Sequence, residues 1–178
     1  VNSARTGVIS PYRTKTLGTG VRFGVPIGDD ESIFYGLSVE QTALSITTAS
    51  PARVIQYVDL FGSSTTNLTG TIGWGYDNRD SAIYTTEGTV QRATVSTTLT
   101  PSDQKFYKLN YQHQWFYPLS KTFTLRLNGE LAKASGYDGE ELPFTQHYYA
   151  GGPDSVRGYV INSLGPRDDL NNSLGGTR

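Results

Sequence analysis

Apolar and polar side chains alternate along much of the chain, which is the pattern of β-strands that have one apolar and one polar face. The clearest stretch is 105–117, where the apolar positions are Tyr107, Leu109, Tyr111, Trp115 and Tyr117. The stretches that alternate in the same way are 21–27, 33–42, 68–79, 89–99 and 122–131. The pattern predicts an all-β protein whose neighbouring strands form antiparallel hairpins.

The connectors between these strands differ in length. Short turns are expected near 28–31, 84–88 and 118–121, and long loops at about 47–66 and 134–158. The connector at 100–104 is short as well, so the alternation of lengths is imperfect. Because outer-membrane barrels pair short periplasmic turns with longer extracellular loops, we place the long loops outside the cell.

The polar faces carry enough charge to line a wet lumen. Their charged residues are Arg22, Glu40, Arg92, Lys108, Arg126 and Glu130. Aromatic residues gather near expected strand ends, as in Trp115, Phe116 and Tyr117, which is typical of the belts at membrane interfaces. These features favour a membrane barrel over a soluble sandwich or lipocalin-like barrel. The soluble alternative would instead turn its apolar face inward.

Composition narrows the classes of function. The hydrophobic fraction of 36% is thin for a soluble core of 178 residues but suits a barrel with a polar interior. A net charge of −1 without any basic run gives no surface for nucleic acid. There is no cysteine, and no nucleophile elbow, phosphate loop or His-Glu-x-x-His motif. Because these catalytic motifs are absent, neither an enzyme nor a cofactor is expected. The acidic clusters at 29–31, 138–141 and 168–169 lack calcium-loop spacing, so no metal site is expected either.

The segment 151–159 places an arginine among glycines within a long loop. Glycine permits positive φ angles and close backbone approach, and Arg157 offers a rigid five-donor fork suited to a buried carboxylate. The segment resembles the Val-Arg-Gly-Phe/Tyr motif of the BamA/TamA family of outer-membrane β-barrel assembly and secretion proteins. In that family a long extracellular loop folds back into the barrel lumen. The residues of the motif are Gly151, Gly152, Val156, Arg157, Gly158 and Tyr159.

A second stretch, 74–88, resembles the part of the same family in which an aspartate-rich strand end leads into a Pro-Thr-x-Gly turn. The residues concerned are Asp77, Arg79, Asp80 and Gly88. The sequence departs at Thr85, where the family usually has proline, and we expect this to loosen the turn. The three charged residues either form an ion network facing the lumen or simply build the turn. The segments 143–152 and 162–167 also resemble the approach to and exit from the folded-back loop.

The resemblance covers roughly residues 17–178 and implies part of an antiparallel transmembrane β-barrel with a long loop folded into its lumen. About seven of sixteen strands would be present, the seventh beginning at Gly175. Residues 1–178 would then be one portion of a single outer-membrane β-barrel domain. The closing strands and the periplasmic transport-associated domains would lie outside it.

By resemblance, the function is the assembly and insertion of β-barrel proteins in the outer membrane of a Gram-negative bacterium, without ATP or cofactor. The implied partners are outer-membrane lipids, client β-barrel proteins, and accessory assembly lipoproteins bound through the periplasmic domains. The alternatives are a two-partner secretion or autotransporter-assembly barrel of the same family, a passive outer-membrane channel and, least favoured, a barrel-embedded hydrolase.

Arg157 requires a partner if the loop folds inward, because an unpaired buried charge is costly. The resemblance places the partner carboxylate on the closing strands. Glu130 and Glu40 are the alternatives within the chain.

Overall fold

The computed structural model describes residues 12–47, 50–153, 155–167 and 173–177. Six strands form one antiparallel sheet in chain order, from β1 at one edge to β6 at the other. They are β1 (Tyr12–Pro26), β2 (Glu31–Ile46), β3 (Ser64–Asp77), β4 (Gly88–Leu99), β5 (Phe106–Pro118) and β6 (Thr124–Gly136). The predicted fold class, an antiparallel barrel sheet, is confirmed.

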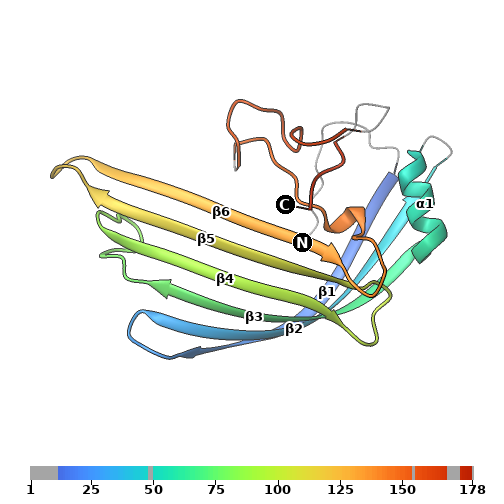
Figure 1. Ribbon diagram of the computed structural model, residues 1–178, viewed down its shortest axis with the longest axis horizontal. Helices are drawn as coiled ribbons and strands as arrows, with labels where there is room; N and C mark the ends of the chain where they lie inside the picture. The colour runs from blue at the N-terminus through green and yellow to red at the C-terminus, as the bar shows by residue number, and fades with distance from the viewer. Residues whose placement is uncertain (1–11, 48–49, 154, 168–172, 178) are drawn as a thin grey trace.

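The sheet is long and curved, with short turns at one end and longer segments at the other (Figure 1). At the longer end lie the helix α1 (Ala52–Phe61) and the segment 137–177, which contains the 3-10 helix η1 (Phe144–Gln146). The chain was expected to supply about seven strands. The seventh is limited in the described residues to a bridge between Gly176 and Tyr148, together with a 2.8 Å bond from the Ala134 amide to the Thr177 carbonyl.

The two faces of the sheet differ as the alternation predicts. The register places Arg92 opposite Gln112, and Gln112 opposite Glu130, on the concave face. The convex face carries large apolar side chains that remain exposed, among them Leu17, Phe23, Leu37, Ile72, Val95, Leu109, Trp115, Leu127 and Leu131. A soluble barrel would bury these side chains, so the polar concave face and the apolar convex face confirm the membrane interpretation.

The helix α1 lies within residues 47–66, where the sequence predicted a long loop. The missed signal is an apolar period of 3.6, because Val54, Tyr57, Val58 and Phe61 share one helix face. That face packs at the concave end of the sheet in a core formed by Leu44, Val54, Tyr57 and Phe144, with Tyr12, Val58 and Phe61 at its rim. The core therefore joins β2, α1 and η1.

The connector between β3 and β4 spans 78–87 and is longer than the predicted turn at 84–88. The connectors at 27–30 and 119–123 are short, as expected. None of the helices in the described residues is long and apolar enough to cross a membrane.

Candidate functional site

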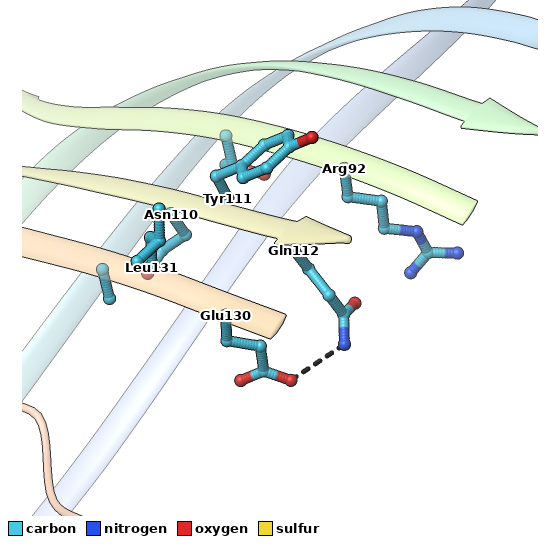
Figure 2. Close-up of a pocket in the computed structure, with 8 residues that line it drawn as sticks. Arg92, Asn110, Tyr111, Gln112, Glu130 and Leu131 are labelled. Carbon is cyan, nitrogen blue, oxygen red and sulfur yellow. Dashed lines mark hydrogen bonds between the residues drawn. The ribbon is translucent and has the colours of Figure 1, made fainter. Parts of the chain in front are cut away.

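The concave face of β4, β5 and β6 forms a shallow polar hollow (Figure 2). Gln112 Nε2 donates to Glu130 Oε1 at 2.8 Å and to Asn128 Oδ1 at 3.3 Å. Arg92 lines the same hollow, so cation, carboxylate and amides lie together on the wall. Such a wall stays hydrated or binds polar chain segments, as the lumen of an outer-membrane barrel does.

The segment after β6 docks on this wall. Lys108 Nζ donates to Gln146 Oε1 at 3.1 Å and lies 5.0 Å from the centroid of the Tyr148 ring. The Tyr148 hydroxyl donates to Asn110 Oδ1 at 2.7 Å. Burial raises the pKa of Tyr148, which keeps its hydroxyl protonated and able to donate. These contacts place the long loop against the lumen face, as predicted.

The helix α1 ties together two distant parts of this loop. The Arg53 guanidinium donates to the Leu174 carbonyl at 3.2 Å and lies 4.9 Å from the centroid of the Phe144 ring. His147 Nδ1 lies 2.8 Å from the same carbonyl oxygen. His147 therefore makes a structural contact within the loop.

A cluster of buried polar side chains, Asn67, Gln104 and Tyr57, joins α1 to β3 and to the connector between β4 and β5. Asn67 Nδ2 donates to Gln104 Oε1 at 2.9 Å, and the Gln104 amide N–H donates back to Asn67 Oδ1 at 3.2 Å. Gln104 Nε2 also donates to the Tyr57 hydroxyl. The Gln104 side chain is almost fully buried, so its hydrogen bonds replace those it would make with water. Sequence reasoning missed this cluster, because residues far apart in the chain meet there.

The glycines of the 151–159 segment have the backbone that their residue type permits. The φ angles of Gly151, Gly152 and Gly158 are 113°, 100° and 90°. A Cβ at Gly151 would lie 2.4 Å from the Val160 carbonyl oxygen, which no side chain tolerates. The Gly151 amide donates to Ser155 Oγ at 2.8 Å, which closes a tight turn.

The other residues of the motif, Val156, Arg157 and Tyr159, are exposed. Within the described part of the chain, no ion pair joins Arg157 to Glu40 or Glu130. Glu40 instead accepts from the Thr42 hydroxyl at 3.4 Å, and Glu130 accepts from Gln112. The carboxylate partner of Arg157 therefore stays a prediction.

The connector 78–87 is held by its own acidic residues. Arg79 donates to Asp77 through two bonds, Nε to Oδ1 at 2.8 Å and a terminal nitrogen to Oδ2 at 2.7 Å. The Asp80 carboxylate accepts from the Thr86 hydroxyl and from the Thr86 amide, the latter at 2.9 Å. Chiefly through the Thr86 hydroxyl, these bonds lower the pKa of Asp80. Arg79 and Asp77 are thus paired with each other, and Asp80 is bonded within the turn; the orientation of this network toward the lumen stays a prediction.

Gly88 and Thr85 complete this connector. Gly88 has a φ of 118°, and a Cβ there would lie 2.7 Å from the Asn78 carbonyl oxygen. The Thr85 hydroxyl donates to the Ser81 carbonyl at 2.6 Å. This hydroxyl supplies a bond that proline lacks, and the expected loosening of the turn by Thr85 stays a prediction.

The described residues contain no group of acidic and histidine side chains that could hold a metal ion. In the cluster at 138–141, Asp138 Oδ2 lies 2.5 Å and Glu140 Oε1 3.8 Å from Lys105 Nζ. The hydrogen bond from Lys105 lowers the pKa of Asp138. The cluster at 168–169 lies outside the described residues.

A curved antiparallel sheet with a lipid-compatible outer face and a loop docked on a polar inner face defines a segment of an outer-membrane β-barrel. The family model for the Omp85 superfamily domain matches residues 2–178, and the chain belongs to this superfamily. The membership confirms the predicted location in the outer membrane of a Gram-negative bacterium.

Individual relatives agree with this assignment. The chain is 34% identical over 168 residues to the outer membrane protein assembly factor BamA of Neisseria meningitidis serogroup B, covering 89% of this chain and 21% of that protein. It is 24% identical over 172 residues to the protein of the same name from Nitratidesulfovibrio vulgaris, covering 94% of this chain and 21% of the relative. The chain thus spans about a fifth of the length of these relatives.

The fold also matches a crystal structure, that of BamA from Haemophilus ducreyi lacking POTRA domains 1-3. The TM-score is 0.80 at 28% identity, and the match covers 93% of this chain and 34% of the other. The six strands therefore correspond to part of a larger barrel.

Proposed function

We propose that this chain is part of a barrel that assembles and inserts other β-barrel proteins into the outer membrane. The observation that carries the proposal is the loop docked on the lumen wall through Tyr148 and Lys108, in a sheet that superposes on a BamA barrel. The two relatives from Neisseria meningitidis and Nitratidesulfovibrio vulgaris are both named outer membrane protein assembly factors, which supports assembly over the secretion branch of the same family.

A passive channel is the candidate of a different class. It requires an open lumen, whereas here α1 and the 137–177 segment lie together at the concave end of the sheet (Figure 1). The core of Leu44, Val54, Tyr57 and Phe144 packs that end with side chains. We therefore expect the whole barrel to conduct ions weakly.

The remaining parts of the proposal concern the whole protein. Clients would be unfolded β-barrel proteins, and outer-membrane lipids would surround the convex face. Accessory assembly lipoproteins would bind through periplasmic transport-associated domains, with residues 1–178 forming one portion of the barrel domain. The barrel would act without cofactor and without catalytic chemistry, through positioning of client strands.

We further propose that Arg157 pairs with a carboxylate from barrel strands other than the six described. Arg157 is exposed, and the six-stranded sheet is not closed. Closure of the barrel by further strands would surround Arg157 with the wall of the lumen. The rigid turns at Gly151 and Gly152 would aim it there.

The test is reconstitution of the full-length protein in liposomes of phosphatidylcholine and phosphatidylglycerol with a purified, unfolded eight-stranded outer-membrane protein. We expect the client to become heat-resistant faster than in empty liposomes. The matched control is a Tyr148→Phe variant, which removes the bond to Asn110 but keeps the ring. Large, steady conductance without acceleration of client folding would support the channel instead.

A further inference from the structure

The charged residues on the convex face of the sheet are unevenly distributed. On β1 this face carries the odd-numbered positions, because Tyr12 on the same strand turns to the concave side and contacts the ring of Phe144. The register extends this assignment to the other strands. Within the six strands, the charged residues of the convex face are Arg13, Lys15, Glu31 and Lys133. The three cations lie toward the end of the sheet where α1 and the 137–177 segment are found, and the one anion lies at the opposite end (Figure 1).

The end with the three cations is the extracellular one, since outer-membrane barrels have short periplasmic turns and longer extracellular loops. Arg13 and Lys15 lie at the start of β1, and Lys133 lies three residues before the end of β6. Glu31 begins β2 at the periplasmic end. The lipid-facing surface of the six strands is therefore positively charged at its extracellular rim, and these strands bring no acidic side chain to that rim.

Arg13 and Lys15 form a pair of cations on one face of β1. They are two residues apart in the chain, which places them roughly 7 Å apart along the strand. Both are exposed, and no ion pair joins either one to another described residue. Gln41 and Ser64, which are hydrogen-bonded to each other at 3.3 Å, add an amide and a hydroxyl to the same face near this end. Because two neighbouring like charges repel, the pair favours binding of an anion.

Beyond the two cations, the convex face of β1 is apolar toward its periplasmic end. Leu17, Val21 and Phe23 are exposed on it, interrupted only by Thr19. Val21 and Phe23 also line an apolar groove of about 380 Å³, which continues over β2, β3 and β4 with Leu37, Ile72, Val95 and Leu99. Lys15 lies roughly 20 Å along the strand from Val21, and one leaflet of a bilayer with its headgroups is about equally thick. A single lipid molecule can therefore extend from the cations to the groove.

We propose that Arg13 and Lys15 bind the headgroup of a phosphate-bearing lipid in the outer leaflet, and that an acyl chain of this lipid lies along Leu17 and in the groove at Val21. An arginine fork and a lysine ammonium both bind phosphate oxygens. A zwitterionic headgroup offers the pair no net negative charge, and a soluble anion makes no use of the apolar strip. This site depends on the lipid-facing surface of the barrel and not on the assembly activity proposed above, so either can fail without the other.

The first experiment measures lipid retention by the full-length protein in detergent, using native mass spectrometry. The probes are diphosphorylated lipid A and, as the zwitterionic comparison, phosphatidylcholine. We expect Arg13→Gln combined with Lys15→Gln to lower the affinity for lipid A about fivefold for each cation removed, and to leave retention of phosphatidylcholine unchanged. Heat resistance on gels shows that the variant folds. Wild-type retention of lipid A by the folded double variant, or an equal loss for both lipids, would overturn the proposal.

The matched control is Lys133→Gln, which removes a cation from the same face and the same end of the sheet, but at its other edge and without a second cation on the neighbouring strand β5. We expect Lys15→Gln alone to weaken retention of lipid A about fivefold and Lys133→Gln to leave it unchanged. Equal losses for these two single variants would show a general attraction of lipid A to the charged rim, and the specific site would be refuted.

The second experiment separates a lipid site from a site for any phosphorylated anion. The competitors are the deacylated, phosphorylated headgroup of lipid A and inorganic phosphate. We expect neither to displace bound lipid A at an equal concentration, because neither fills the apolar strip and groove. Displacement by either one would overturn the lipid assignment. Client insertion in the liposomes described above tests the proposed function separately. Insertion by a wild-type protein that retains no lipid A refutes the lipid site alone, and retention without insertion refutes the assembly function alone.

Discussion

The two faces of the sheet are built from alternate residues of the same six strands, yet they are suited to different solvents. Leu131 on the convex face is 72% exposed, and its neighbour Glu130 on the concave face is exposed as well. Exposure alone does not separate the faces. Their chemistry does, because the convex side chains are mostly apolar and the concave ones carry the hydrogen bonds of Gln112, Asn110 and Lys108. Burial within the protein is therefore a poor guide to which side chains stabilise a membrane barrel.

The largest effect is expected at Arg157, which would be a buried charge on the concave side of the closed barrel. Arg157→Ala in the full-length protein should lower barrel stability by about 3–5 kcal/mol if the arginine is paired and buried in the closed barrel. Arg157→Lys should rescue little, since an ammonium cannot replace a bidentate fork. Both variants are compared with the wild type by heat resistance on gels and by the rate of client insertion. Wild-type behaviour of the alanine variant, with ready labelling of a cysteine at 157 from outside the cell, would show that the loop is solvated.

A substitution on the convex face should have the next largest effect. Leu131 lies near the middle of β6, so Leu131→Arg should cost about 2–4 kcal/mol. Leu125 begins the strand near an interface, and Leu125→Arg should cost only about 0–1 kcal/mol. Asn128→Arg, on the concave face beside Glu130, serves as the lumen control and should be mild. Denaturant titration in liposomes ranks the three. Equal costs at 131 and 128 would contradict the assignment of the faces.

A smaller loss of stability is expected at the end of the concave face where α1 packs. Gln104→Leu should cost about 1–3 kcal/mol, because it leaves the buried Asn67 Nδ2 without its acceptor and removes one of the hydrogen bonds of the Tyr57 hydroxyl. Gln114→Leu is the matched control, since Gln114 makes no side-chain hydrogen bond to another described residue. Thermal unfolding of the full-length protein compares them. If the two variants unfold alike, the cluster does not hold α1 in place.

The smallest effect concerns the connector 78–87, which touches neither face. Asp80→Asn should leave the barrel intact and speed hydrogen exchange at the Thr86 amide, relative to its intrinsic rate. Because the pKa of Asp80 is lowered on folding, its stabilising contribution is complete above its unfolded value of about 4 and is lost as pH falls through the lowered value. Protection of Thr86 in the wild type should therefore be constant from pH 7 to 5. A loss of protection within that window would mean that another group titrates there.

Sequence reasoning succeeded where a local rule applies. The alternation at 105–117 fixed which side chains of β5 share a face, and positive φ angles occur at Gly88, Gly151 and Gly152, where close backbone approach excludes a side chain. It failed at α1, because the apolar period of this helix lies in a stretch where a loop was expected. The residue types of this stretch were compatible with more than one local structure.

The sequence by itself determined the strands, their two faces and the turn glycines, because a period of two residues and a steric requirement at one residue are local properties. Only the tertiary structure decided which residues distant in the chain meet on the concave side of the sheet. Tyr148 reaches Asn110, Gln104 reaches Asn67, and Arg53 reaches Leu174 across long stretches of chain. Such pairs depend on the curvature of the sheet and the path of the loop, and hydrogen-bonding side chains of these types are common enough that no pattern in the sequence selects one partner over another.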